Sequence, residues 1–292
     1  MKVVITGALG HIGSKLIRSL QSYDIVMIDN FYTQRYCSLF NLGGNQEFIQ
    51  GDILDMDLDR VFSSADVVIH LAAITDAESS FDKKELIDRI NLQGTERVAR
   101  ACAKMGCGMI YASTTSVYGV SDGEVDETCM ELKPQSPYAE SKLKAERMLA
   151  TIDGLRYIIL RMGTIFGVSE GMRFHTAVNK FCLQASLGQP ITVWRTALNQ
   201  NRPYLDLSDM VRAVKFIIAM NLFNKEVYNL VTVNTTVQDI LDIIRTTNIE
   251  YVDSPIMNQL SYTVSSDKFK NLGFEFNGDI VRGINETMEL LS

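Results

Sequence analysis

The stretch Lys2-Val3-Val4-Ile5-Thr6-Gly7-Ala8-Leu9-Gly10-His11-Ile12-Gly13 decides the fold of this chain. Its first five residues form a short, mostly apolar run that stops at a glycine, which predicts a buried strand of a parallel sheet. From about residue 11 to residue 20, apolar side chains recur at helical spacing and predict an amphipathic helix. The three glycines therefore lie in a tight turn between a strand and a helix.

Each glycine of this turn has a physical reason to lack a side chain. Gly7 permits the tight turn, Gly10 lets the backbone come close to a bound diphosphate, and Gly13 lets the helix pack close to the sheet. The N–H groups at the start of the helix, those of His11 and Ile12 included, then face the anion. Because G-x-x-G-x-x-G also occurs in ordinary strand-to-helix turns, the dinucleotide site predicted here needs support from other residues.

Asp29 supports a dinucleotide site and favours NAD. It ends the second expected strand (24–28) about 20 residues beyond the turn, where a carboxylate binds both ribose hydroxyls and repels the 2′-phosphate of NADP. Arg35 keeps NADP open, because a nearby arginine can accommodate that phosphate. Further cofactor contacts are expected beside Asp29 and at the ends of the next strands, namely Asn30, Asp52, Ile53, Leu71, Ala72 and Ala73.

Strand and helix patterns alternate through the first half of the chain. The expected strands are 24–28, 47–50, 66–70, 109–112 and 157–160, and the longest expected helices are 83–104 and 138–151. This alternation predicts an α/β fold with a Rossmann-type doubly wound parallel sheet and right-handed crossovers.

The pattern changes after Gly167, which predicts a smaller C-terminal substrate-binding subdomain. The elements expected there are helices at 172–187, 208–220 and 280–291, an extended segment at 191–194, and a further sheet strand at 228–231 with 236–245 as its helix. We assign residues 1–167 to an NAD-binding Rossmann domain that also receives about 205–247, and residues 168–204 and 248–292 to the small subdomain.

Composition excludes several classes of protein. The chain has 292 residues and a net charge of -7 without a basic stripe, so a nucleic-acid partner is not expected. Neither a targeting segment nor a membrane span is seen, so we expect a soluble, cytoplasmic protein. Five cysteines without close pairs indicate reduced thiols, and three widely spaced histidines predict no metal site.

Tyr138 and Lys142 lie four residues apart in the expected helix 138–151 and therefore share one face. An ammonium beside a phenol favours the phenolate, which can take a proton from a substrate hydroxyl while hydride leaves for the cofactor. Ser113 and Thr114 follow the fifth strand, where a hydroxyl can orient the reacting oxygen. A solvated helix face and a loop that caps itself are the alternative interpretations of these two segments.

Taken together, these motifs resemble the extended short-chain dehydrogenase/reductase family, and within it the NAD-dependent nucleotide-sugar epimerases and dehydratases, such as UDP-glucose 4-epimerase. The resemblance covers nearly the whole chain. It rests on the glycine turn, Asp29, Asp52-Ile53, His70 to Ala73, Asn91 to Thr95, Ser113 to Gly119, Ser136 to Lys142, Leu160 to Gly167 and Gln200 to Asp209.

The resemblance implies a role for individual residues. Tyr138 is the base and acid, Lys142 holds the nicotinamide ribose and tunes Tyr138, and Thr114 stands at the family's Ser/Thr position. Arg202 stands where the family has an arginine that contacts the substrate diphosphate. Asn91 is expected among the cofactor contacts. A homodimer through the helices at about 83–104 and 138–151 is also implied.

Two positions narrow the expected reaction. The family's 4,6-dehydratases resemble one another in an Asp-Glu pair after the catalytic Thr, where this chain has Thr115 and Ser116. Hydroxyls are poor acids and bases at neutral pH. The resemblance therefore implies a nucleotide-sugar 4-epimerase that acts through a transient 4-keto intermediate. A net NAD-dependent sugar or alcohol oxidoreductase (or a decarboxylase or dehydratase) and a non-catalytic NAD sensor remain alternatives.

The expected sugar pocket departs from the family's commonest one. Thr164 stands where many hexose epimerases have Asn, and Thr75 where some have Lys. Arg173 either meets a sugar carboxylate or is a solvated charge, and Trp194 either stacks on the nucleotide base or packs in a core. The sequence leaves the sugar and the nucleotide open.

Overall fold

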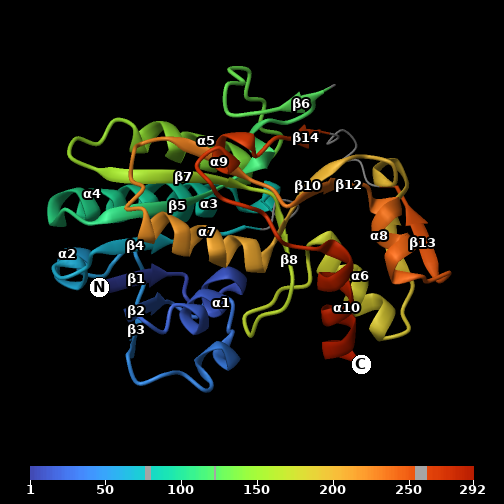
Figure 1. Ribbon diagram of the computed structural model, residues 1–292, viewed down its shortest axis with the longest axis horizontal. Helices are drawn as coiled ribbons and strands as arrows, with labels where there is room; N and C mark the ends of the chain where they lie inside the picture. Colours follow the sequence, from blue (N-terminus) through green and yellow to red (C-terminus); the bar gives the residue numbers. More distant parts are fainter. Residues whose placement is uncertain (76–79, 122, 254–261) are drawn as a thin grey trace.

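A seven-stranded parallel sheet forms the centre of the protein (Figure 1). The computed structural model describes residues 1–75, 80–121, 123–253 and 262–292. The strand order is β11-β7-β5-β4-β1-β2-β3. The strands are β1 (Lys2–Thr6), β2 (Asp24–Asp29), β3 (Gln46–Gln50), β4 (Val67–His70), β5 (Gly108–Thr114), β7 (Arg156–Met162) and β11 (Val227–Leu230). The chain reverses direction of travel across the sheet at β1 and β4, which is the Rossmann arrangement predicted.

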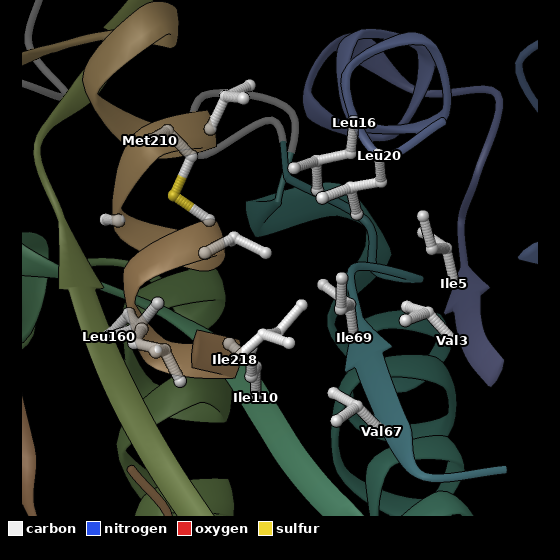
Figure 2. Close-up of a cluster of buried hydrophobic side chains, with 14 of the residues drawn as sticks. Val3, Ile5, Leu16, Leu20, Val67, Ile69, Ile110, Leu160, Met210 and Ile218 are labelled. Atoms are coloured by element: carbon white, nitrogen blue, oxygen red, sulfur yellow. The ribbon is translucent and has the colours of Figure 1, made fainter. Parts of the chain in front are cut away.

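Helices cover both faces of this sheet, because successive residues of its central strands are apolar and point to opposite faces. Val3 and Ile5 of β1 pack in the cluster with α1 (His11–Ser19) and α7 (Leu207–Ala219), which Figure 2 shows. Val4 packs in the opposite cluster. The helices of that second cluster are α2 (Leu58–Phe62), α4 (Thr95–Met105) and α5 (Pro137–Leu149).

A smaller lobe is formed by segments that come before and after β11 in the chain. Its helices α6 (Ala177–Ser186), α8 (Val237–Ile244) and α10 (Ile280–Leu291) share one apolar cluster and lie together beyond the sheet in Figure 1. Three small sheets complete the fold. They contain β8 (Thr164–Phe166), β10 (Arg202–Asp206) and β12 (Val233–Thr235); β9 (Ile191–Trp194) and β13 (Ile249–Val252); and β6 (Glu124–Val125) and β14 (Thr263–Val264).

Two helices differ from their predicted extents. The expected helix 172–187 begins only at Ala177, and residues 172–176 are not helical. The expected helix 83–104 is one helical segment of three parts, α3 (Lys84–Ile87), a π-helical stretch (Asp88–Gly94) and α4. The wider turns of a π-helix are a frequent feature of functional sites.

The predicted division at 205–247 also differs in detail. We expected residues 236–245 to cover the large sheet, but Val237, Ile240 and Leu241 of α8 pack in the small lobe. Conversely, Phe269 and Phe274 pack with α7 against the large sheet, although they belong to the segment assigned to the subdomain. The division into two domains therefore stays a proposal. Within the described part of the chain, no helix has the length and apolar character needed to cross a membrane.

Candidate active site

The glycine turn lies between β1 and α1, and close backbone packing explains its glycines. Gly7 has φ +68°, and a Cβ there would lie 2.7 Å from the Ala72 nitrogen. A Cβ on Gly13 would lie 2.5 Å from the Ala8 carbonyl oxygen. A Cβ on Gly10 would lie 3.2 Å from the Gly7 oxygen, with an Arg35 guanidinium nitrogen at 3.8 Å. The turn is thus a cradle without side chains, and its size and open amides suit a diphosphate.

The segment between β8 and α6 covers this turn. The Gly171 N–H donates to Ser14 Oγ at 2.9 Å, and the Ser169 hydroxyl donates to the His11 oxygen at 2.9 Å. His11 Nε2 donates to the Gly167 oxygen at 2.7 Å, and burial lowers the pKa of His11 to about 3, so this imidazole is neutral. His11 thus ties the segment to the turn through its side chain, a contact that the sequence did not predict.

The ends of β2 and β3 bring together the residues predicted to bind the adenosine half of the cofactor. Asp29 accepts the N–H groups of Leu9 (3.1 Å) and Phe31 (2.9 Å), and burial raises the pKa of this carboxyl. Asn30 donates to Asp52 at 2.9 Å, and Ile53 next to it is buried. The fold thus brings these residues together at one edge of the sheet, and their contacts with the cofactor stay predictions.

The side chain of Asn91 joins two other parts of the site, and its predicted contact with the cofactor stays a prediction. Its Oδ1 accepts the Ile74 N–H at 2.8 Å, and its Nδ2 donates to the Ile74 oxygen (2.9 Å) and to Ser141 Oγ (3.1 Å). Its amide thus fastens the loop after β4, which contains Leu71, Ala72 and Ala73, to helix α5. The structure makes Asn91 a positioning residue of the site.

Thr114 and Tyr138 meet at the carboxyl end of the sheet. Thr114 ends β5, and Tyr138 lies in the first turn of α5, whose start Ser136 caps by accepting the Ala139 N–H at 3.2 Å. Burial raises the pKa of the Tyr138 phenol, whereas the Arg173 charge and a hydrogen bond with Thr114 lower it. This arrangement can hold a phenol and a hydroxyl against one reacting oxygen.

Lys142 lies one turn further along α5 and is nearly inaccessible. Its Nζ donates to the Ala112 oxygen at 2.8 Å and lies 4.9 Å from the centre of the Tyr111 ring. Burial lowers the pKa of this ammonium to about 7, and Glu146 opposes the shift. We expected the ammonium itself to lower the pKa of Tyr138, but the cation that does so in this structure is Arg173.

The substrate residues predicted from sequence lie in three places. Thr75 and Arg173 hydrogen-bond to each other next to Tyr138. Thr164 of β8 lies opposite Tyr204 of β10, the strand that Arg202 begins. Trp194 ends β9, which pairs with β13 at the far end of the small lobe from β5 (Figure 1).

Ser113 does not face the site as predicted. It is 1% exposed, and its hydroxyl donates to Glu146 beneath α5. Its place immediately before Thr114 explains the expectation, because successive side chains of a strand point to opposite faces. Ser113 is thus a packing and hydrogen-bonding residue of the sheet interior.

Sequence reasoning missed Tyr262. Its phenol oxygen lies 3.3 Å from Thr115 Oγ1. Burial raises the pKa of Tyr262, hydrogen bonds with Thr115 and Ser116 and the charge of Arg202 lower it, and Tyr262 in turn raises the pKa of Tyr138. No spacing motif marks an isolated tyrosine so far along the chain, and only the fold brings it to Thr115. Among the residues that the structure describes, no group of three His, Cys, Asp or Glu side chains is placed to hold a metal ion.

A Rossmann sheet with a glycine turn, a carboxylate at the end of β2 and a Thr–Tyr–Lys set at its carboxyl edge defines a dinucleotide-dependent short-chain dehydrogenase/reductase of the extended type. The chain belongs to the NAD-dependent epimerase/dehydratase family, whose model matches residues 3–230.

Relatives within this family carry out more than one reaction. The chain is 30% identical to the dTDP-D-glucose 4,6-dehydratase of Mus musculus over 99% of its own length and 88% of that protein. It is 28% identical to a trifunctional UDP-glucose 4,6-dehydratase/3,5-epimerase/reductase of Arabidopsis thaliana over 98% of its length, but spans only 46% of that protein.

Solved structures show the same fold. The UDP-glucuronic acid 4-epimerase from Bacillus cereus, crystallised with UDP-glucuronic acid and NAD, superposes with a TM-score of 0.90. The sequence identity is 25%, and the match covers 100% of this chain and 99% of the other. The cofactor of this family is therefore NAD.

Proposed function

We propose that the chain is an NAD-dependent nucleotide-sugar 4-epimerase. The turn at Gly7, Gly10 and Gly13 suits the diphosphate of NAD, because a Cβ on Gly7 or Gly13 would collide with backbone atoms of Ala72 or Ala8, so only glycine allows the turn to be this tight. Asp29 suits the adenosine ribose. Arg35, whose guanidinium lies near Gly10, would reach the same end of the cofactor. Lys142 would hold the nicotinamide ribose.

One observation carries the choice of reaction. The segment that meets Tyr138, Thr114 to Ser116, offers hydroxyl groups and no carboxyl group. A 4,6-elimination needs an acid and a base beyond the tyrosine, whereas a 4-epimerisation needs only one group that takes and returns a proton. The similarity to the B. cereus 4-epimerase over the whole chain supports the same choice.

The chain's residues would act on the sugar as follows. Tyr138 takes the proton of the C4 hydroxyl, Thr114 hydrogen-bonds the reacting oxygen, and Arg173 stabilises the phenolate by its charge. NAD, when bound, supplies the acceptor and later the donor of one hydride. Tyr138 returns its proton to the C4 oxygen after the transient 4-keto sugar has turned its other face, so no coenzyme is consumed.

The test is a screen of UDP-, dTDP-, GDP- and CDP-sugars with products identified by NMR. UDP-glucuronic acid belongs in the panel, because a guanidinium such as Arg173 can pair with a sugar carboxylate. We expect a C4 epimer, no accumulation of NADH, and loss of the product with Tyr138→Phe. Stoichiometric NADH release with every active sugar would refute the epimerase.

A 4,6-dehydratase is the second candidate, because the similarity to the mouse enzyme extends over 99% of the chain. The same screen separates the two reactions. A dehydratase gives a 4-keto-6-deoxy sugar and water, and an epimerase gives an isomer of unchanged mass. Mass spectrometry of the product therefore decides between them.

A further inference from the structure

A row of polar side chains crosses the interior of the large sheet beneath α5. Arg161 of β7 lies directly opposite Ser113 of β5 on one side and Asn229 of β11 on the other. All three residues are buried. A charged group in the middle of a buried parallel sheet is costly unless it is paired and hydrogen-bonded.

Glu146 of α5 supplies the partner of this row. Arg161 Nη2 donates to Glu146 Oε2 at 2.7 Å and Arg161 Nε to Oε1 at 3.1 Å, so the pair is bidentate. The Ser113 hydroxyl donates to the same carboxylate. The guanidinium also stacks 5.0 Å from the Tyr118 ring, whose hydroxyl donates to Asn229 at 2.9 Å. No step of the proposed reaction uses this pair.

Lys142 lies one helical turn before Glu146 and shares its buried face. The groups that face its ammonium are the Ala112 carbonyl and the Tyr111 ring of β5 and, from β4, His70, which burial keeps neutral by lowering its pKa to about 3. Against these neutral groups, Glu146 is the carboxylate that acts on Lys142. Arg161 in turn pairs with Glu146 and opposes its charge.

We propose that Glu146 and Arg161 are positioning residues that together set the charge of Lys142. Glu146 holds Lys142 protonated in a buried place, and Arg161 limits that effect. The pair also fastens α5, with Tyr138 and Lys142, to the strands that end at Thr114 and Met162. The catalytic meaning of this charge rests on the proposed function, in which Lys142 holds the nicotinamide ribose beside Tyr138.

The proposal predicts how the pH midpoint of Lys142 titration ranks among variants of Glu146 and Arg161. A pair with a purely structural role would leave that midpoint unchanged. Glu146→Gln leaves the positive charge of Arg161 without its partner, so the Lys142 midpoint falls by about one pH unit or more. Arg161→Gln leaves Glu146 unopposed and raises the midpoint. The double variant Glu146→Gln/Arg161→Met removes both charges and lies between Glu146→Gln and the natural protein. Arg161→Lys keeps the charge and stays near the natural midpoint.

Lysine labelled with carbon-13 at Cε reports these midpoints by NMR in the cofactor-free protein. The Lys142 signal is the one that is absent in Lys142→Arg. Thermal unfolding of each variant identifies those that fold, and the double variant, which buries no unpaired charge, keeps the test possible if a single variant unfolds. Equal midpoints in the folded variants, or the reverse order, would overturn the proposal.

Activity gives the second measurement. In the holoenzyme, the alkaline limb of the kcat/KM profile should shift in the same order as the NMR midpoints. If no nucleotide sugar is converted, the proposed function fails. The Lys142 midpoints measured by NMR still test the Glu146–Arg161 proposal in that case. If conversion occurs but the midpoints do not move, the epimerase stands and this inference fails.

Discussion

Two groups lower the pKa of the Tyr138 phenol against the effect of its burial, namely the positive charge of Arg173 and a hydrogen bond with Thr114. Because desolvation opposes ionisation, the balance at this one side chain decides whether the site works near neutral pH. Both helpers come from segments far from α5 in the chain. The reactivity of the tyrosine is thus a property of the folded site and not of the helix that carries it.

Replacing Tyr138 by Phe should abolish the proton transfer without disturbing the fold. We expect kcat to fall by about 10²–10⁴-fold, the usual contribution of a general acid–base group. Steady-state kinetics measure the loss, and Tyr251→Phe at an exposed position is the matched control. Near-natural turnover in Tyr138→Phe would assign the proton transfer to another group.

Arg173 should control the pH dependence of the reaction. Removing its charge in Arg173→Gln raises the pKa of Tyr138, so the acidic limb of the kcat/KM profile should move to higher pH. Arg173→Lys should restore part of the shift, because it keeps the charge and loses the guanidinium geometry. An acidic limb that stays in place in Arg173→Gln would show that another cation acts on the phenol.

At the scale of elements, the segment between β8 and α6 joins the two halves of the site. It contacts the glycine turn through Ser169 and Gly171, and two residues later Arg173 reaches Tyr138. A Cβ on Gly171 would collide with the carbonyl oxygens of Leu9 and Gly10. The segment must therefore keep a glycine at this position to lie against the turn.

Gly171→Ala should push this segment off the turn. We expect weaker NAD binding and a lower kcat together, because this segment covers the turn and also carries Arg173. Calorimetry of NAD binding measures the first effect. Gly44→Ala is the control, since a Cβ there meets no atom within 4 Å. Unchanged NAD affinity in Gly171→Ala would contradict this account of the segment.

An element can be predicted from the sequence when it depends on residues that are close together in the chain. The strand β1 and the start of α1 were predicted because apolar runs and glycine spacing are local patterns. The π-helical stretch contains Asn91, whose side chain binds Ile74, and the segment before α6 binds the glycine turn through Gly171, so both involve contacts between residues far apart in the sequence. The side on which α8 packs depends on contacts between residues far apart in the sequence, and so does the position of Tyr262 beside Thr115. The spacing of apolar residues does not predict such contacts.

At the scale of the whole molecule, two buried neutral histidines make the stability depend on pH. Thr6 donates to His70 Nδ1 at 2.7 Å, and His70 Nε2 donates to Thr95, which itself donates to Asn91. Burial lowers the pKa of both His11 and His70 to about 3, against 6.5 for an unburied imidazole. Between these values the unfolded chain binds more protons than the folded one.

The free energy of unfolding should therefore fall as the pH decreases from about 6.5 toward about 3. Each histidine contributes a slope of up to about 1.4 kcal/mol per pH unit within that window. Urea unfolding at several pH values measures the slope. His70→Gln and His11→Gln should each make it shallower. A slope that stays the same in both variants would refute this origin of acid sensitivity.

We also propose that two chains pair through the helical segment of α3 and α4 and through α5. Light scattering should give twice the 32.7 kDa of one chain. Arg147→Glu, on the exposed face of α5, should shift the equilibrium toward the single chain, and Lys215→Glu on α7 should not. A single-chain mass for the natural protein would rule out this dimer.

The segment from Gly167 to Arg173 has a practical consequence for protein engineering. The segment contacts the glycine turn and also supplies Arg173, whose charge acts on Tyr138. Variants with random residues in this segment would therefore change cofactor binding and sugar preference at the same time. Thr75 and Thr164 avoid the direct contact with the glycine turn. Efforts to redirect the enzyme toward another sugar should diversify these two threonines first and leave Gly171 untouched.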